Sequence, residues 1–244
     1  MMRRIFLPPL WSRELSPAAL LTLFLLGLGG QILSSALFSH LLSALFPQME
    51  QMAVVWLAVL LSEVLGIVFL LAAWRNLLPG KIPDMRPMDK RMWKLTFAAF
   101  IIAVTGSGVL GGFWQSFLDL TGIPYSDEQD VTEMFRSSSL YGKLLIGFTA
   151  VLIVPFFEEL LFRRTLYALF VRWGNVAAIV LASLIFGAAH GFLLGTPSLC
   201  WIGLVFQVFY LYSRNIWVST AAHAILNFTA LLGVLLQIIF PNFA

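Results

Sequence analysis

Carboxylate and guanidinium side chains occur at helical spacing within an apolar stretch of the chain. Glu158 and Glu159 are adjacent, and Arg163 follows Glu159 by four residues. Because residues four apart share one face of a helix, Glu159 and Arg163 are expected to neutralise each other. Glu158 points about 100° away from its neighbour, which leaves it free to meet another helix. The two adjacent carboxylates therefore have different expected roles.

Two histidines further along the chain also have partners at helical spacing. His190 follows Phe186 by four residues, so the aromatic ring can pack beneath the imidazole and hold it. His223 precedes Asn227 by four residues, which places the two on one helix face. Together with Glu158, these groups supply a general base, a second acid or base, and donors for a developing oxyanion. Hydrolysis of an amide bond requires this set.

Each motif also has a purely structural interpretation. The two glutamates could form a salt-bridge cluster with Arg163 and Arg164 at a helix end. His190 and Asn227 could serve only as interhelical hydrogen bonds, the usual duty of polar residues in membrane bundles. The presence of all three motifs in one chain favours the hydrolytic interpretation.

The three motifs, in this order, resemble those of the CPBP family, which includes the CAAX prenyl endopeptidases and Abi-type, bacteriocin-processing proteins. They are the Glu-Glu-x-x-x-Arg of Glu158, Glu159 and Arg163, the Phe-x-x-x-His of Phe186 and His190, and the His-x-x-x-Asn of His223 and Asn227. The resemblance extends over residues 140–240, where we expect a CPBP-like catalytic core. That core would lie within one integral membrane domain of residues 1–244.

The resemblance implies a role for each motif residue. Glu158 would activate a water for attack on a peptide carbonyl, with His190 on the same water. His223 and Asn227 would stabilise the oxyanion. The supporting residues would be Glu159, Arg163 and Phe186.

Two mechanisms are possible, and they differ in whether a metal cofactor is needed. The preferred mechanism is free of metal and needs no cofactor. The alternative is zinc bound by Glu158, His190 and His223, because one carboxylate and two imidazoles leave an open position for water. The helical His-Glu-x-x-His pairing of zinc proteases is absent from the sequence.

The expected function is an intramembrane endopeptidase, whose substrate is a membrane-associated or C-terminally modified protein or peptide, lipidated ones included. One alternative is a non-proteolytic relative that binds a partner or confers bacteriocin immunity. Another is a proton-coupled transporter, since buried Glu and His also form proton relays. Against transport, the sequence shows no internal repeat of the kind common in transporters.

The composition places these residues in a lipid bilayer. Of the 244 residues, 60% are hydrophobic and only 11% are charged, whereas about 25% are charged in soluble proteins. Each span needs roughly 20 apolar residues, so we expect an all-α polytopic bundle of about seven transmembrane helices, within a range of six to eight. A charge at the bilayer centre costs about 2.5 to 3.5 kcal/mol, so ionisable residues inside spans are functional candidates.

Apolar runs predict where the seven helices lie. They are near residues 18–45, 52–78, 95–118, 140–162, 175–191, 197–212 and 217–240. Basic residues gather on one side of these runs: Arg3, Arg4, Arg13, Arg75, Lys81, Arg86, Lys90, Arg91, Lys94, Arg163, Arg164, Arg172 and Arg214. The positive-inside rule therefore predicts a plasma or inner membrane protein with a cytoplasmic N-terminus. Membrane orientation explains the net charge of +3 without a nucleic-acid partner.

The depth of the candidate residues presents a conflict. A helix rises about 1.5 Å per residue, so Glu158 lies near the cytoplasmic end of a fourth span that ends at Phe162. His223, early in the last span, lies near the cytoplasmic side as well. His190, late in the fifth span, would lie nearer the opposite side. Residues 163–173 could form a helix extension or a re-entrant piece that shifts the fifth span, and the sequence does not decide between the two.

Overall fold

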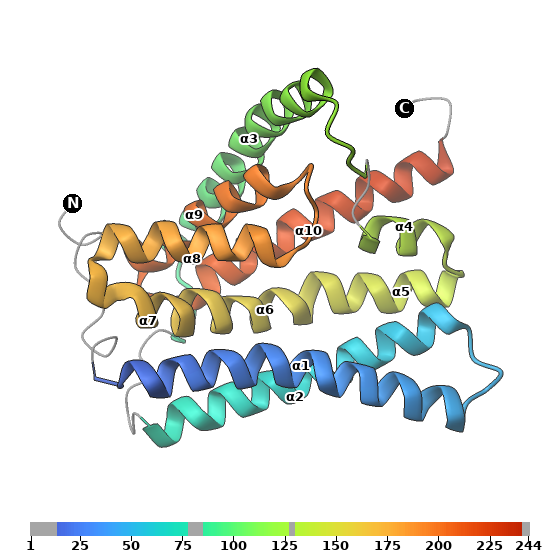
Figure 1. Cartoon of the computed structure of the whole chain (residues 1–244), viewed down its shortest axis with the longest axis horizontal. Helices are drawn as coiled ribbons and strands as arrows, with labels where there is room; N and C mark the ends of the chain where they lie inside the picture. The colour runs from blue at the N-terminus through green and yellow to red at the C-terminus, as the bar shows by residue number, and fades with distance from the viewer. Residues whose placement is uncertain (1–13, 78–84, 127–129, 241–244) are drawn as a thin grey trace.

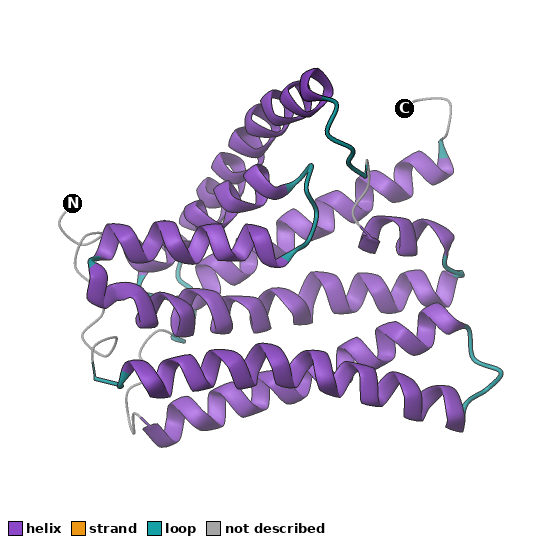
Figure 2. Cartoon of the chain, viewed as in Figure 1, coloured by secondary structure: helices purple, strands orange, loops and turns teal. Residues whose placement is uncertain are grey.

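The computed structural model describes residues 14–77, 85–126 and 130–240. Every regular element in these ranges is a helix, as Figure 2 shows, which confirms the all-α prediction. Four of the basic residues used for the predicted orientation lie outside the described part: Arg3, Arg4, Arg13 and Lys81.

Helices α1 and α2 form an antiparallel pair along one side of the bundle (Figure 1). They span Pro17–Leu45 and Gln51–Leu77. Ser16 caps α1 by accepting a hydrogen bond from the Ala19 N–H at 3.1 Å. Pro17 suits the first turn, where its missing N–H would have no intrahelical partner.

Helix α3 spans Lys90–Thr121 and packs against α9 and α10. Asp89 caps its start, accepting from the Met92 N–H at 2.8 Å. Its end is marked by Gly122 in the left-handed conformation, with φ of 68°, a common way to stop a helix.

A continuous helical stretch of 34 residues, Leu140–Trp173, follows the short helix α4 (Asp130–Ser137). Its segments are α5 (Leu140–Phe148), η3 (Thr149–Ile153), α6 (Val154–Glu158), η4 (Glu159–Leu166), α7 (Tyr167–Phe170) and η5 (Val171–Trp173). We refer to it as the long helix. In Figure 1 it runs between the α1–α2 pair and α8.

Two π-helical segments, η3 and η4, flank Glu158 in the long helix. At the end of η3 the Val154 N–H donates to the Thr149 carbonyl five residues back. Pro155 follows directly and has no N–H to donate to the preceding turn, which accounts for the local change in pitch. Such π segments occur frequently at functional sites.

Three helices complete the fold. They are α8 (Asn175–Ala189), α9 (Thr196–Ser213) and α10 (Ile216–Ile239). Gly174, with φ of 101°, reverses the chain between the long helix and α8. Arg214, with φ of 54°, separates α9 from α10.

Five helical stretches in the described ranges are long and apolar enough to cross a membrane, which confirms the polytopic bundle. They are Pro17–Leu45, Gln51–Leu77, Lys90–Thr121, Leu140–Trp173 and Ile216–Ile239. The other two expected spans are the 15-residue α8 and the 18-residue α9, both shorter than the roughly 20 residues of a full span. Residues 163–173 are a helix extension, not a re-entrant piece.

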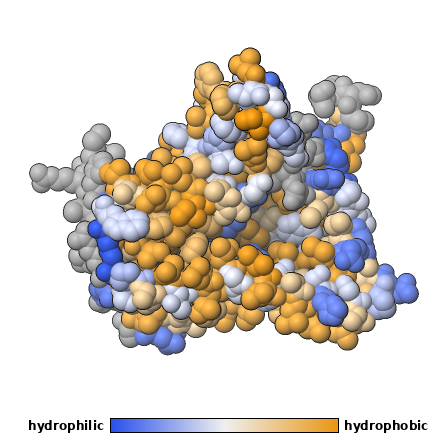
Figure 3. Space-filling model, viewed as in Figure 1, coloured by the Kyte–Doolittle hydropathy of each residue, from blue (hydrophilic) through white to orange (hydrophobic). Residues whose placement is uncertain are grey.

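The surface agrees with a lipid environment. In Figure 3 apolar residues cover most of the middle of the visible face, and hydrophilic residues gather toward its left and right ends. Large apolar side chains point outward, such as Leu33 at 73% exposure and Leu120 at 87%. Hydrocarbon chains solvate such side chains, so the chain is an integral membrane protein.

Basic side chains gather at the end of the bundle where α2 finishes and α3, α8 and α10 begin. Those of the described residues are Arg75, Arg86, Lys90, Arg91, Lys94, Arg172 and Arg214. Arg163 and Arg164 were counted with the basic residues at this end, but both are fully buried in the long helix. Arg136 and Lys143 lie at the opposite end, around the start of the long helix.

Candidate active site

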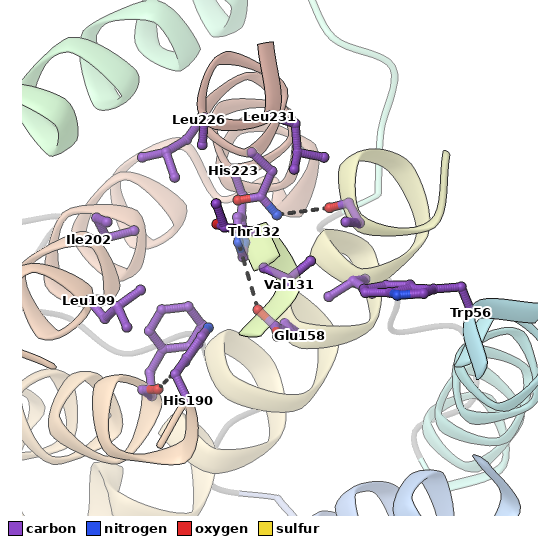
Figure 4. Close-up of a pocket in the computed structure, with 15 residues that line it drawn as sticks. Trp56, Val131, Thr132, Glu158, His190, Leu199, Ile202, His223, Leu226 and Leu231 are labelled. Carbon is purple, nitrogen blue, oxygen red and sulfur yellow. Dashed lines mark hydrogen bonds and ion pairs between the residues drawn. The ribbon is translucent and has the colours of Figure 1, made fainter. Parts of the chain in front are cut away.

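A pocket of about 220 Å³ collects the candidate catalytic residues. Glu158, His190, His223 and Asn227 all line it, together with Phe186. Figure 4 shows that Glu158 of the long helix, His190 of α8 and His223 of α10 converge on one space. Helices that are distant in the sequence thus bring the three motifs together.

The length of the long helix resolves the conflict over the depth of His190. Gly174 reverses the chain, and α8 packs back along α7. Glu158 lies as many residues before Gly174 as His190 lies after it. The reversal at Gly174 therefore carries His190 back to the region of Glu158, and both side chains line one pocket. The expectation of different depths was wrong because the fourth helix continues to Trp173.

Glu158 faces α10 across the pocket. Its Oε2 lies 3.7 Å from Nε2 of His223. The Glu158 side chain is 19% exposed, whereas that of His223 is 5% exposed. Glu158 is therefore the carboxylate that a molecule in the pocket would meet.

Glu159 lies behind this surface in a fully buried ion pair. Both of its carboxylate oxygens accept from Nε of Arg163 at 3.2 Å, as the spacing of four residues predicts. The Arg163 guanidinium also lies over the Phe186 ring, 4.4 Å from its centroid. Oε1 of Glu159 lies 3.3 Å from Nδ1 of His223 as well. The pair thus connects the long helix to α8 and α10.

The contact between Glu159 and His223 was not predicted. Helical spacing predicted only Arg163 as a partner of Glu159, because Arg163 lies on the same helix. The two residues are 64 positions apart, so helical spacing carries no signal for their contact. The packing of α10 against the long helix creates it.

His190 is oriented by its own helix. Its Nδ1 lies 2.8 Å from the Phe186 carbonyl oxygen, and the two rings meet edge to face with centroids 4.8 Å apart. A carbonyl only accepts, so this contact places the proton on Nδ1. In the neutral ring, Nε2 is then an acceptor.

Asn227 is held by the first half of the long helix. Its Nδ2 donates to the Ala150 carbonyl at 2.8 Å. An amide nitrogen carries two hydrogens, so a second one stays available for another acceptor. Asn227 and His223 line the same pocket, as expected from their spacing on α10.

The zinc alternative finds no preformed set of three ligands among the described residues. No group of three His, Cys, Asp or Glu side chains among the described residues is placed to hold a metal ion. In the proposed set of Glu158, His190 and His223, Nδ1 of each histidine contacts an oxygen of the chain, which leaves Nε2 of each as the nitrogen that could bind a ligand.

Several pocket residues lie outside the predicted motifs. Trp56 comes from α2, and Val131 and Thr132 come from α4. Their residue types occur in any apolar helix, so the sequence held no signal that they face Glu158. Glu63 lies outside this pocket, where it is buried and accepts a hydrogen bond from Gln31 at 3.1 Å.

Comparison with known families agrees with the motifs. Residues 140–229 match the family described as type II CAAX prenyl endopeptidase, Rce1-like. The match begins with the long helix, ends within α10 and contains all seven predicted site residues. It supports the resemblance inferred from the sequence and the assignment to CAAX-type proteases. No curated protein and no solved structure matches the chain.

Proposed function

We propose that the chain, whose residues 140–229 match the Rce1-like family, is a CAAX-type protease that cleaves a peptide bond within the membrane by water that Glu158 activates. The observation that carries this proposal is the position of Glu158, partly exposed at the wall of a pocket and opposite His223. The catalytic core would comprise residues 140–240 of a single membrane domain.

The attack step needs two acceptors for one water. The Glu158 carboxylate accepts a proton as the water oxygen bonds to the scissile carbonyl carbon. Nε2 of neutral His190 accepts the second hydrogen of the same water and so orients its lone pair. The hydrogen bond from Nδ1 of His190 to the Phe186 carbonyl supports this tautomer.

The carbonyl oxygen that becomes negative needs donors. His223 faces a carboxylate at each ring nitrogen, and only the protonated ring donates from both nitrogens at once. When Glu158 takes up the proton, it loses its negative charge and attracts Nε2 of His223 less strongly. The Nε2–H of His223 can then donate to the oxyanion. The second N–H of Asn227 completes the pair of donors.

Collapse of the tetrahedral intermediate completes the reaction. The proton on Glu158 passes to the leaving nitrogen, the C–N bond breaks, and a carboxylic acid and an amine result. Glu158 returns to its charged form. Glu159 holds Nδ1 of His223 throughout, and Arg163 balances the charge of Glu159.

The substrate proposed is a membrane-associated or C-terminally modified protein or peptide, with lipidated peptides as one class. Apolar side chains form most of the pocket wall, among them Val154, Leu199, Ile202 and Leu226. Such a wall binds apolar side chains or lipid better than charged ones. We further propose that the N-terminus is cytoplasmic, in a plasma or inner membrane.

The test is cleavage of quenched fluorescent peptides, prenylated ones included, by the purified protein in lipid. We expect Glu158→Ala to lower the rate by about a hundredfold or more, and exhaustive chelation to leave the wild-type rate unchanged. Loss of the rate on chelation, restored by zinc, would contradict the metal-free mechanism. Absence of cleavage by the wild type would favour a partner-binding protein, and proton transport dependent on Glu158 would favour a transporter.

A further inference from the structure

We propose that Trp56 of α2 is a substrate-binding residue of this site, which packs its ring against the substrate and donates its indole N–H to a substrate backbone carbonyl. The inference rests on the proposed peptidase function. It assigns a role to a residue outside residues 140–229, the part of the chain that matches the family.

The first observation is the position of Trp56. It lines the same pocket as Glu158, His190, His223 and Asn227. Figure 4 shows its ring extending from α2 toward Glu158. Tryptophans near span ends often sit at the lipid interface, but Trp56 is only 8% exposed. Its ring therefore belongs to the pocket wall and not to the lipid-facing surface.

The second observation is its indole nitrogen. Nε1 of Trp56 is buried and has no hydrogen-bond partner among the described residues. Three other tryptophans of the bundle do donate this hydrogen within the chain: Trp74 to Thr165 at 3.2 Å, Trp114 to Leu193 at 2.9 Å and Trp201 to Ile102 at 3.0 Å. A buried N–H without an acceptor is costly. Trp56 differs from these three tryptophans because its acceptor would be a carbonyl of the bound substrate.

The third observation is what fixes the ring. Trp56 packs in a buried cluster with Phe135, Ile146, Ala150, Leu231 and Val234. The Ala150 carbonyl also holds Nδ2 of Asn227 at 2.8 Å. Ala150 thus belongs to the cluster around Trp56 and also binds Asn227, a proposed oxyanion donor. A peptide whose reacting carbonyl meets Asn227 would present a neighbouring carbonyl on the side of Trp56.

The experiment compares Trp56→Phe, which removes the N–H and keeps an aromatic ring, with Trp56→Ala, which removes both. We expect Trp56→Phe to raise KM about threefold to tenfold with kcat nearly unchanged, as for one lost hydrogen bond. Trp56→Ala should raise KM further. The matched control is Trp114→Phe, which removes an N–H already bonded to Leu193 and should leave KM unchanged.

A set of modified peptides identifies the acceptor. In each peptide one carbonyl next to the scissile bond is replaced by a methylene group. For one position, wild type and Trp56→Phe should cleave the modified peptide with equal KM, because the partner of the N–H is gone. An undiminished effect of Trp56→Phe on every modified peptide would overturn the assignment. An effect on kcat and thermal stability alone would show a structural role.

Failure of the proposed peptidase function would be seen separately. Binding of a fluorescent prenylated peptide is measured for Glu158→Ala and for Glu158→Ala with Trp56→Phe. Weaker binding by the double variant, with no cleavage by the wild type, would keep the binding role of Trp56 and reject the peptidase. Equal binding by the two variants would reject the role of Trp56.

Discussion

His223 lies between two carboxylates that are neighbours in the sequence. Nε2 faces Glu158 at 3.7 Å in the pocket, and Nδ1 faces Glu159 at 3.3 Å in the core. The imidazole therefore separates a carboxylate that meets the pocket from one that is sealed behind it. The same residue type occupies two different environments here because successive side chains on a helix point in different directions.

Substitution of the two glutamates should give opposite results for stability and activity. Glu159→Gln leaves Arg163 buried without its counter-charge, so we expect a loss of about 3 to 5 kcal/mol in the free energy of unfolding. Glu158→Gln should abolish cleavage and leave that free energy nearly unchanged, since Glu158 is partly exposed. Thermal unfolding in detergent and peptide cleavage measure the two effects. Equal destabilisation by both variants would contradict this division.

At the scale of elements, Glu50 connects the start of α2 to the start of α5, outside the membrane-spanning segments. It lies just before α2 and accepts hydrogen bonds from the hydroxyl and the backbone N–H of Ser139, which caps α5. The Ser139 side chain, followed by its backbone N–H, lowers the pKa of Glu50 from its ordinary value of 4.5. This contact joins the α1–α2 pair to the long helix.

The pH dependence of this contact has a definite sign. A carboxyl with a lowered pKa in the folded state stabilises the protein above its unfolded pKa, and this contribution is lost as the pH falls through the folded pKa. The stability difference between wild type and Glu50→Gln should therefore be greatest at neutral pH and shrink below pH 4.5. Unfolding temperatures from neutral to acidic pH measure it. A difference that is constant with pH would show that the charge of Glu50 is irrelevant.

The turn at Gly174 sets the level of His190 against Glu158. Its φ of 101° is unfavourable for any side chain with a Cβ, although space for one is open. Gly174→Ala should lower the free energy of unfolding by about 1 to 3 kcal/mol and reduce cleavage by shifting α8.

The control for this substitution is Gly233→Ala in α10. A Cβ there also meets open space, but the backbone is helical. Alanine is a better helix former than glycine, so the stability should rise by up to about 1 kcal/mol. The comparison uses urea or thermal unfolding together with the cleavage rate. Similar losses in both variants would mean that the conformation of Gly174 is not the cause.

At the scale of the whole molecule, the orientation in the membrane is open to test. Cys200 is the single cysteine, so Cys200→Ala provides a background without thiols. Gln48→Cys and Asn76→Cys place exposed thiols near opposite ends of α2. In intact cells an impermeant maleimide should label position 48 and not position 76. The reverse pattern would place the N-terminus outside.

The sequence alone determined the membrane environment, the helical class and the contacts within single helices. The pairs Glu159–Arg163 and Phe186–His190 follow from spacing because backbone hydrogen bonds set the helical period locally. The number of full spans and the places of Arg163 and Arg164 did not follow. An apolar run does not show where a helix ends when polar residues inside it are buried by other helices.

Only the tertiary structure decided which helices meet and at what level. It put His190 beside Glu158, joined Glu159 to His223, and placed Trp56 of α2 in the wall of the pocket. These contacts join residues far apart in the chain, and they depend on helix length, on the turn at Gly174 and on the π segments beside Glu158. Side-chain packing among several helices sets these features together, so no short pattern in one helix specifies them.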